Sequence, residues 1–199
     1  MNVEIKQDVY QQVPKFEGEK WLLRQVAMSD AENLLKIYSD KESIPLFNAD
    51  NCNGDTFYYD TEEKMKNAIR FWINSYDNKE FVRWSIISRA ENAAVGTVEL
   101  FHRDANDYFT STGLLRLDLR SDYECEESIE EILQMIIPTT YDLFYCSQIA
   151  TKAVPAAKKR IQALRKMEFH RTEHKMIGHV LMLIAKIQNV HLEVMKWIV

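Results

Sequence analysis

A chain of 199 residues with 46% hydrophobic residues is long enough to bury one sizeable core, but it is too short for two independent domains. The formal net charge of −5 argues against a nucleic-acid partner, because phosphate backbones are bound by basic surfaces. The longest purely apolar run, Val180–Ala185, is far too short to span a bilayer, and the polar N-terminus lacks the apolar stretch of a secretion signal.

The cysteines and histidines give no sign of a metal site. Cys52, Cys125 and Cys146 are spaced like neither a disulfide framework nor a zinc motif, so we expect reduced thiols in a cytoplasmic protein. His170 and His174 lie four residues apart, but no third ligand accompanies them, and we therefore expect no metal.

The first half of the chain predicts a strand followed by two helices. Residues 1–19 are expected to form an N-terminal arm or an extension of the sheet edge. Trp21–Val26 alternates like a short strand, and Asp30 is a suitable N-cap residue for the helix that follows. The second helix is predicted over Thr61–Tyr76, where apolar residues recur at helical spacing.

A long polar loop, 43–60, separates the two helices and carries four aromatic residues: Phe47, Phe57, Tyr58 and Tyr59. Loops of this length inside a compact domain often act as lids, so one interpretation is that these side chains form a wall of a substrate site. The alternative is that the aromatic rings simply plug the open end of the core.

From Val82 onward the apolar pattern alternates, which predicts an antiparallel meander of three strands, Val82–Arg89, Val95–Phe101 and Leu114–Leu119. A helix that is kinked or interrupted at Pro138 should follow, and the next strand should run parallel to the last meander strand. The remaining predicted elements are the helix Glu127–Tyr145, the strand Gln148–Val154, the helix Ala156–Met167, a strand over 169–178, and a segment, 179–199, that forms either strands, which we favour, or one helix.

The stretch Leu114–Leu133 joins a strand to a helix, a junction that often binds phosphate through the free N–H groups of the first helical turn. Here the junction holds no glycine after Gly113. Ser121 and Glu124 have the spacing of a capping box, which would occupy those N–H groups. An acid-rich helix start that is stabilised by the helix dipole explains all six acidic residues. They are Asp122, Glu124, Glu126, Glu127, Glu130 and Glu131.

Four stretches resemble, in this order and spacing, the GNAT superfamily of acyl-CoA N-acyltransferases, and most closely the branch that acetylates ribosomal-protein N-termini, polyamines and small amines. They are WLLRQVAMSDAENLLKIYSD, WSIISRAENAAVGTVELF, LDLRSDYECEESIEEIL and AAKKRIQALRKMEF. The resemblance covers about Trp21 to Gly178. It implies an α+β fold, with a single domain over 1–199 built on a mixed, mostly antiparallel central sheet flanked by helices.

The resemblance also implies acetyl-CoA as the cofactor. In the family, a loop with the pattern R/Q-x-x-G-x-G/A wraps the pyrophosphate with backbone N–H groups. That pattern falls here on Glu124, Glu127 and Ile129. Leu119 and Arg120, at the end of the preceding strand, belong to the same expected cofactor site. A carboxylate a few ångströms from a pyrophosphate costs about 2–4 kcal/mol even at a surface-like dielectric constant. The chain therefore departs from the family pattern where the phosphates would bind.

The later helix departs from the family pattern as well. In N-x-x-S-x-x-x-L-x-K-x-G-F the Asn and the Ser face the pantetheine arm, but here Ala157 and Arg160 stand in those places and Glu168 replaces the glycine. Arg160 belongs to a basic run that either holds the 3′-phosphate of the nucleotide or forms a solvated face paired with the acidic junction. The run comprises Lys158, Lys159, Arg160, Arg165 and Lys166.

Acyl transfer to an amine needs a base for the ammonium proton and a donor for the developing oxyanion. Glu99 is the first candidate for the base, because it points away from the face that Val98 and Leu100 occupy, and Asp118 on the next strand is the second. The alternative for Glu99 is a solvated position on the sheet. His102 is expected at the surface, at the end of a strand.

Two functions remain open from the sequence. The first is a GNAT-like transfer of acetyl from acetyl-CoA to a small-molecule or peptide amine. The second is a catalytically silent GNAT-fold protein that binds or regulates a partner and no longer binds CoA. Neither a nucleic acid nor a membrane is expected as a partner, and an apolar C-terminal strand at an open sheet edge would favour a homodimer.

Overall fold

A computed structural model describes residues 8–47, 56–174 and 181–186. Within these ranges the chain forms one eight-stranded sheet, four α-helices and three short 3₁₀ helices. The strands are β1 (Phe16–Glu17), β2 (Trp21–Gln25), β3 (Val82–Ser88), β4 (Ala93–Arg103), β5 (Thr112–Leu119), β6 (Gln148–Ala153), β7 (His170–Arg171) and β8 (Leu181–Lys186). The helices are α1 (Ala31–Tyr38), α2 (Glu62–Asp77), α3 (Glu126–Leu143) and α4 (Lys158–Lys166), and the 3₁₀ helices are η1 (Met28–Asp30), η2 (Ile44–Leu46) and η3 (Ser121–Tyr123).

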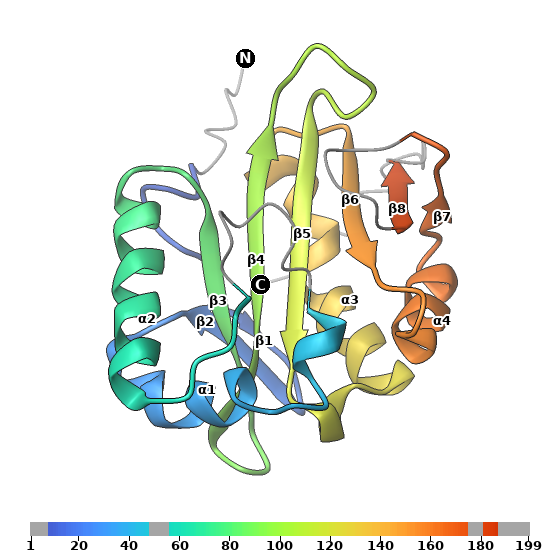
Figure 1. The fold of residues 1–199 in the computed structure, drawn as a ribbon. Helices are drawn as coiled ribbons and strands as arrows, with labels where there is room; N and C mark the ends of the chain where they lie inside the picture. The colour runs from blue at the N-terminus through green and yellow to red at the C-terminus, as the bar shows by residue number, and fades with distance from the viewer. Residues whose placement is uncertain (1–7, 48–55, 175–180, 187–199) are drawn as a thin grey trace, which may run out of the picture.

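The sheet has the strand order β1-β2-β3-β4-β5-β6-β8-β7 (Figure 1). All neighbouring strands run antiparallel except β5 and β6, which pair in parallel over Thr112–Leu115 and Gln148–Thr151. This mixed, mostly antiparallel sheet flanked by helices confirms the predicted fold class. β5 continues to Leu119 after its pairing with β6 has ended. We call the unpaired stretch beside Arg116–Leu119 the β5–β6 gap.

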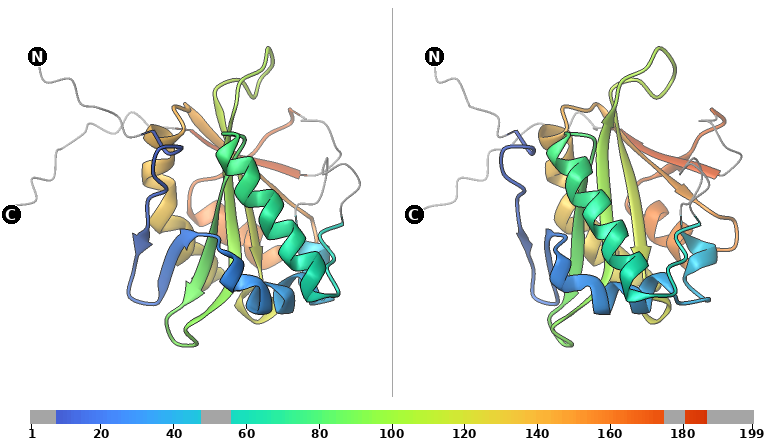
Figure 2. Two further views of the ribbon diagram at one scale, coloured as in Figure 1. Left: turned by 90° about the vertical axis from the view of Figure 1, so that its left-hand side faces the viewer. Right: turned by 60° about the vertical axis from the view of Figure 1, so that its left-hand side comes forward.

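Helices cover both faces of the sheet (Figure 2): α1 and α2 lie on one face, and α3 and α4 lie on the other. Because side chains alternate along a strand, Val98 and Leu100 of β4 pack in the core beneath α3, whereas Glu99 points toward the opposite face. Ile132 and Ile136 of α3 are completely buried in the same core. Each contributes about 1.5–3 kcal/mol of transfer free energy.

The helix after β5 begins later than the sequence predicts. Ser121–Tyr123 forms η3, and α3 starts only at Glu126, with Cys125 as its N-cap and no side-chain cap hydrogen bond. The predicted capping box of Ser121 and Glu124 is therefore wrong, because Glu124 lies outside the helix and makes a tertiary contact instead.

Two other helix features also differ from the prediction, and of the two alternatives at Pro138 only the interruption is wrong. Asp30 precedes α1, but its carboxylate does not cap the helix; it accepts hydrogen bonds from Arg24 at 2.5 Å and from Ser85 at 2.7 Å. α4 begins at Lys158, two residues after the predicted start. α3 runs through Pro138 without interruption.

The described ends of the chain extend the sheet on both sides. Phe16–Glu17 pairs with β2, so this part of the predicted arm is an extension of the sheet edge. The strand predicted over 169–178 is limited to His170–Arg171 within the described part. Leu181–Lys186 forms a strand, as favoured, while the rest of 175–199 lies outside the described residues. β8 pairs with β6 along its whole length, but with β7 only at Leu183 and Ile184, so the described strands cover part of its outer edge and the homodimer stays a prediction. No helix in the described part of the chain is long and apolar enough to cross a membrane.

Gly96 is placed where β4 approaches β5 closely. A Cβ atom at this position would overlap the carbonyl oxygen of Asp118 and lie 2.7 Å from Leu119 Cδ2. We expect Gly96→Ala to lower the free energy of unfolding by about 1–3 kcal/mol, because the backbone of β5 must shift. Gly113→Ala is the matched control, since its Cβ would meet only side-chain atoms, at 3.0 Å or more. Urea denaturation measures both variants, and equal losses would contradict this packing argument.

Candidate functional site

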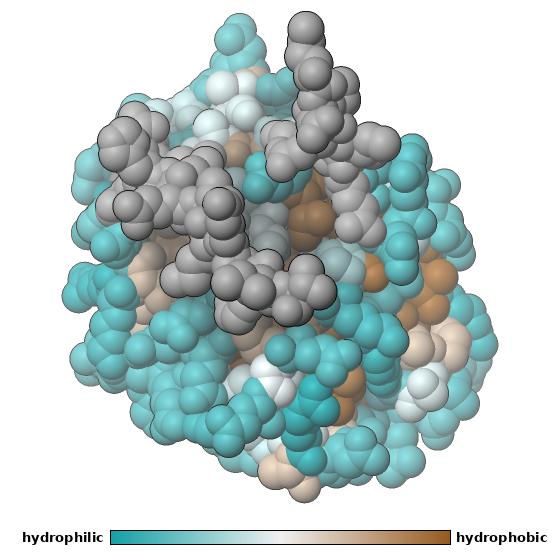
Figure 3. Space-filling model, turned by 180° about the vertical axis from the view of Figure 1, so that it is seen from behind, coloured by the Kyte–Doolittle hydropathy of each residue, from teal (hydrophilic) through white to brown (hydrophobic). Residues whose placement is uncertain are grey.

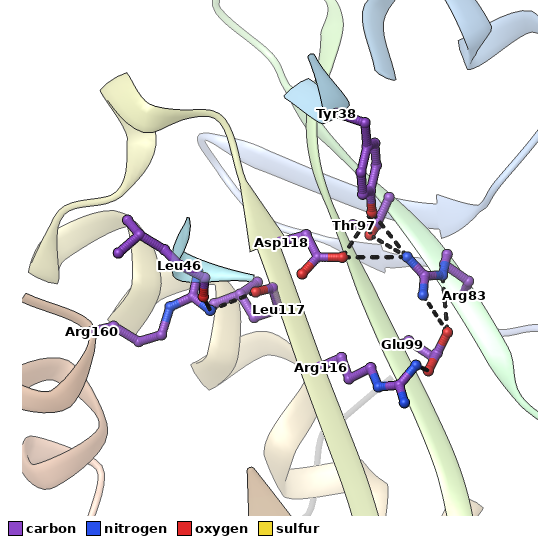
Figure 4. Close-up of polar contacts among 9 residues, drawn as sticks. All are labelled: Tyr38, Leu46, Arg83, Thr97, Glu99, Arg116, Leu117, Asp118 and Arg160. Atoms are coloured by element: carbon purple, nitrogen blue, oxygen red, sulfur yellow. Dashed lines mark hydrogen bonds and ion pairs between the residues drawn. The ribbon is translucent and has the colours of Figure 1, made fainter. Parts of the chain in front are cut away.

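Two clusters of buried charge lie on either side of β5 (Figure 4). The first is centred on Arg83 of β3 and lies beneath α1 and α2. The second is centred on Arg160, whose side chain reaches from α4 to the backbone of β5. The candidate catalytic acids belong to the first cluster, and a candidate cofactor-binding residue lies at the centre of the second.

Arg83 is only 2% exposed, yet its guanidinium is fully engaged. Its Nε donates to Glu99 Oε2 at 3.1 Å, and its Nη2 makes a shorter bond to the same oxygen. Its Nη1 donates to the Tyr38 hydroxyl at 2.9 Å and lies 3.4 Å from Asp118 Oδ2. The guanidinium also lies 4.1 Å from the centroid of the Trp72 ring. Burial opposes the charged form of Arg83, but the nearby carboxylates of Glu99 and Asp118 raise its pKa further above the ordinary value.

Glu99, the first candidate for the base, is held between two arginines by the register of the sheet. Arg83 is its cross-strand neighbour on β3, and Arg116 is its neighbour on β5. Glu99 Oε1 lies 2.9 Å from Arg116 Nη1, in an ion pair without hydrogen-bond alignment. The side chain is 1% exposed, so the alternative of a solvated sheet position is wrong. Both carboxylate oxygens face a guanidinium, and neither is presented to an incoming amine.

Asp118, the second candidate, is also buried and engaged. Its Oδ2 accepts a hydrogen bond from the Tyr38 hydroxyl at 2.8 Å. Burial raises the pKa of the Asp118 carboxyl, although the Arg83 charge and the Tyr38 hydroxyl favour its ionised form. The Tyr38 hydroxyl also lies 2.8 Å from Thr97 Oγ1. Tyr38 thus joins α1 to β4 and β5, a role that the sequence did not indicate.

Arg160 occupies the β5–β6 gap. Its Nη1 donates to Leu117 O at 2.7 Å and to Leu46 O at 3.2 Å. Its Nε and Nη2 donate to the two carboxylate oxygens of Glu124 at 2.8 and 2.7 Å. Arg160 is 3% exposed and Glu124 is 7% exposed. The expectation of a solvated position is therefore wrong for Arg160, which shares the buried face of α4 with Ala163 and Leu164.

A second contact holds the α1–α2 connection against the start of η3. The carboxylate of Asp40 accepts a hydrogen bond from the Ser121 backbone N–H at 3.0 Å and one from Ser43 Oγ at 2.7 Å. Burial alone would raise the pKa of Asp40, but the hydrogen bonds from Ser43 and Ser121 lower it to about 2. Together with the contact of Arg160 at Leu46 O, this holds the described residues 40–46 beside the end of β5 and the start of η3.

The other acidic residues of the junction pair with cations at the surface. Lys166 of α4 lies 2.8 Å from both Glu126 and Glu130, which confirms the expected pairing of the basic run with the acidic junction. On the other side of α3, Lys20 pairs with Glu127 at 2.6 Å and Glu131 at 2.7 Å. The two lysines and Glu127 are exposed, and the other three glutamates are partly exposed, so these solvent-screened pairs contribute little to stability. The molecule viewed from behind the sheet is largely hydrophilic in its lower part (Figure 3).

The other expected cofactor-binding residues follow one another along the junction from β5 to α3, and their side chains make other contacts. The side chains of Leu119 and Ile129 are buried in the core between the sheet and α3. Arg120 forms ion pairs with Glu91 at 2.6 Å and Asp122 at 2.7 Å. Glu127 is exposed and binds Lys20, as described above.

The aromatic residues of the 43–60 loop separate into two groups. Phe47, Phe57 and Tyr59 are buried, and their ring centroids lie 5.3, 6.3 and 5.6 Å from that of Tyr38. Tyr58 is 43% exposed. The three buried rings match the interpretation that the loop plugs the core, whereas Tyr58 alone is presented to solvent.

The residues around the β5–β6 gap do not fit acetyl-CoA as they are arranged. By the resemblance, Arg160 stands where the pantetheine arm passes, and its guanidinium already binds the free carbonyl group of Leu117. Glu124 places a carboxylate where the pyrophosphate loop begins. The first turn of α3 does offer N–H groups without a side-chain cap, but Glu126 and Glu127 share that turn. We therefore derive no reaction step that involves the cofactor.

The Asp118→Asn variant tests the buried carboxyl. A raised pKa means that Asp118 supports folding fully below its ordinary value of 3.8 and loses that support as the pH rises through its folded-state pKa. The amide oxygen of Asn can still accept from Tyr38 without carrying charge. We therefore expect the Tm of the variant to rise relative to the wild type as the pH increases above about 4. For Asp40→Asn we expect the Tm to fall relative to the wild type as the pH rises from about 2 to about 4, and to stay parallel to the wild type above that range, because the pKa of Asp40 is lowered to about 2. The same pH profile for both variants would contradict the assignment.

Comparison with known sequences identifies one family. The sequence profile of the family described as "Acetyltransferase (GNAT) domain" matches residues 20–170. No curated protein sequence gives a significant match.

Several solved structures share the fold. An acetyltransferase (GNAT family) from Bacillus anthracis is 18% identical with a TM-score of 0.65, over 87% of this chain and 98% of that one. A ribosomal-protein-S5-alanine acetyltransferase from Vibrio fischeri is 15% identical with a TM-score of 0.65, over 87% and 96%. A ribosomal L7/L12 alpha-N-protein acetyltransferase in complex with coenzyme A is 11% identical with a TM-score of 0.66, over 87% and 98%.

At these identities the structures establish the fold, and the profile match over most of the sequence establishes the family. The predicted resemblance is confirmed from β2 to the start of β7. The chain belongs to the GNAT acetyltransferase family.

Proposed function

We propose that this chain is a catalytically silent member of the GNAT family, which binds or regulates a partner rather than acetylating amines. The observation that supports this proposal is the engagement of both candidate bases by the buried Arg83 cluster. Glu99 lies between Arg83 and Arg116, and Asp118 accepts from Tyr38.

Acyl transfer requires a base that can reach the amine. A general base must come within about 2.6–3.2 Å of the ammonium proton, directly or through one water molecule. Glu99 and Asp118 lie beneath Tyr38 and Trp72, with both carboxylates on the covered side of the sheet. An amine that reached Glu99 would have to displace a guanidinium, and this would leave a buried charge without its partner.

Acetyl transfer from acetyl-CoA to a small-molecule or peptide amine is the second candidate function. It is favoured by the family match and by the first turn of α3, whose N–H groups are not capped by a side chain and could receive an anion. Two structural neighbours are named as ribosomal-protein acetyltransferases. A further neighbour, from Vibrio cholerae, is named as a putative ribosomal-protein-serine acetyltransferase. Peptides that begin with alanine or serine are therefore the acceptors to test first, together with the polyamines that the family resemblance adds.

An acetylation assay separates the two functions. Purified protein is incubated with acetyl-CoA and the acceptor panel, and mass spectrometry measures the acetylated product. We expect no product above the rate without protein, because no carboxylate of the Arg83 cluster is available as a base. The Vibrio fischeri neighbour serves as the positive control. Turnover that is catalytic in this chain and is lost in Glu99→Gln would contradict our proposal and support the second candidate.

A further inference from the structure

We infer that Arg160 and Glu124 form an internal plug of the β5–β6 gap, which closes this gap to coenzyme A. The inference rests on the proposed function and deepens it, since it names the contact that removes the cofactor site. It concerns binding and not acetyl transfer, so it is tested separately.

The end of the pairing between β5 and β6 leaves a backbone carbonyl group of β5 that needs a hydrogen-bond donor. β5 ends its pairing with β6 at Leu115, and Leu117 lies two residues further along β5. A buried carbonyl group without a hydrogen bond is costly, so the Leu117 oxygen needs a donor. Arg160 Nη1 supplies it at 2.7 Å from the opposite side of the gap. The guanidinium thus replaces the missing strand partner.

Glu124 holds the guanidinium in place. Its two oxygens accept from Nε and Nη2 in a bidentate arrangement, which is the strongest geometry for an arginine–carboxylate pair. The remaining Nη1 bonds go to Leu117 O and Leu46 O. Arg160 therefore connects α4, β5, η2 and the β5–α3 connection through one planar group.

Coenzyme A is a poor competitor for this position. It is an anion, so a bound diphosphate would add charge of the same sign beside Glu124. Displacement of Arg160 would also leave the buried Glu124 carboxylate without a counterion. The contact of Asp40 with the Ser121 N–H also holds the residues that follow α1 beside the start of η3.

A matched control exists on the same two helices. Lys166 of α4 binds Glu126 and Glu130 of α3, but its own side chain is exposed and it makes no contact with Arg160 or Glu124 among the described hydrogen bonds and ion pairs. A variant of Lys166 removes a link between α3 and α4 without removing the plug. It therefore separates an effect of the plug from a general loosening of the two helices.

The test is isothermal titration of coenzyme A and of acetyl-CoA into three proteins. They are the wild type, the double variant Arg160→Ser/Glu124→Gln, and the control Lys166→Ser. The double variant introduces residues of the family pattern at both positions and leaves no unpaired charge. We expect no saturable binding to the wild type or the control below about 1 mM, and binding at least about tenfold tighter by the double variant.

Each outcome decides the inference. Micromolar binding by the wild type overturns it, and so does a folded double variant that binds no more tightly than the wild type. If the double variant does not fold, the Nε–H resonance of Arg160 in the ¹⁵N-labelled wild type replaces it as the readout. The resonance should remain unchanged when coenzyme A is added, and saturable displacement overturns the inference.

The binding experiment and the acetylation assay test the two proposals separately. Wild-type protein that binds coenzyme A but forms no acetylated product overturns the plug and leaves the silent function intact. Catalytic acetylation overturns the proposed function itself. If the wild type neither binds coenzyme A nor acetylates an acceptor, and the folded double variant binds coenzyme A no more tightly, only the role of the plug is overturned.

Discussion

A guanidinium that is withdrawn from water must keep its charge and must be hydrogen-bonded on every side, because an unpaired buried charge costs far more than folding can offset. This chain meets that constraint at Arg160, where a carboxylate and two backbone carbonyl groups surround the side chain. The contacts of this one side chain link α4 to the backbone of β5, to Leu46 in η2, and to Glu124, which lies just before α3. We propose that this ion pair of the protein fills the place at which the cofactor of the family would bind.

The second buried arginine organises the other face of the sheet in the same manner. Arg83 and Glu99 are cross-strand neighbours, as are Glu99 and Arg116, so one row across β3, β4 and β5 alternates in charge. Such ion pairs are weak evidence for net stability, since apolar residues of similar volume would serve as well. They do specify one arrangement of strands and helices, because a shift in register would leave each charge without its partner. The acids that could have served as bases are therefore structural partners, and both clusters support the same view of a silent GNAT-fold protein.

The sequence predicted the elements of this fold better than the roles of its charged residues. Alternation and helical spacing depend on local chemistry, so the meander, α2 and the parallel strand β6 were predicted close to their observed bounds. The direction of Glu99 was also correct, but its burial was not, because burial depends on the arginines that the neighbouring strands bring beside it. Arg160 carried a usable signal: with Ala157 and Leu164 it falls on one helical stripe, which is the buried face of α4. The capping pattern at Ser121 and Glu124 failed for a related reason, since the tertiary pairing with Arg160 replaced the local hydrogen bond.

A crystal structure of the protein grown with millimolar acetyl-CoA tests the central claim most directly. The account predicts that Arg160 Nη1 remains within hydrogen-bond distance of Leu117 O, that Glu124 still binds the guanidinium, and that no cofactor lies between β5 and β6. A structure with the diphosphate on the first-turn N–H groups of α3 and the Arg160 side chain displaced from Leu117 would contradict it.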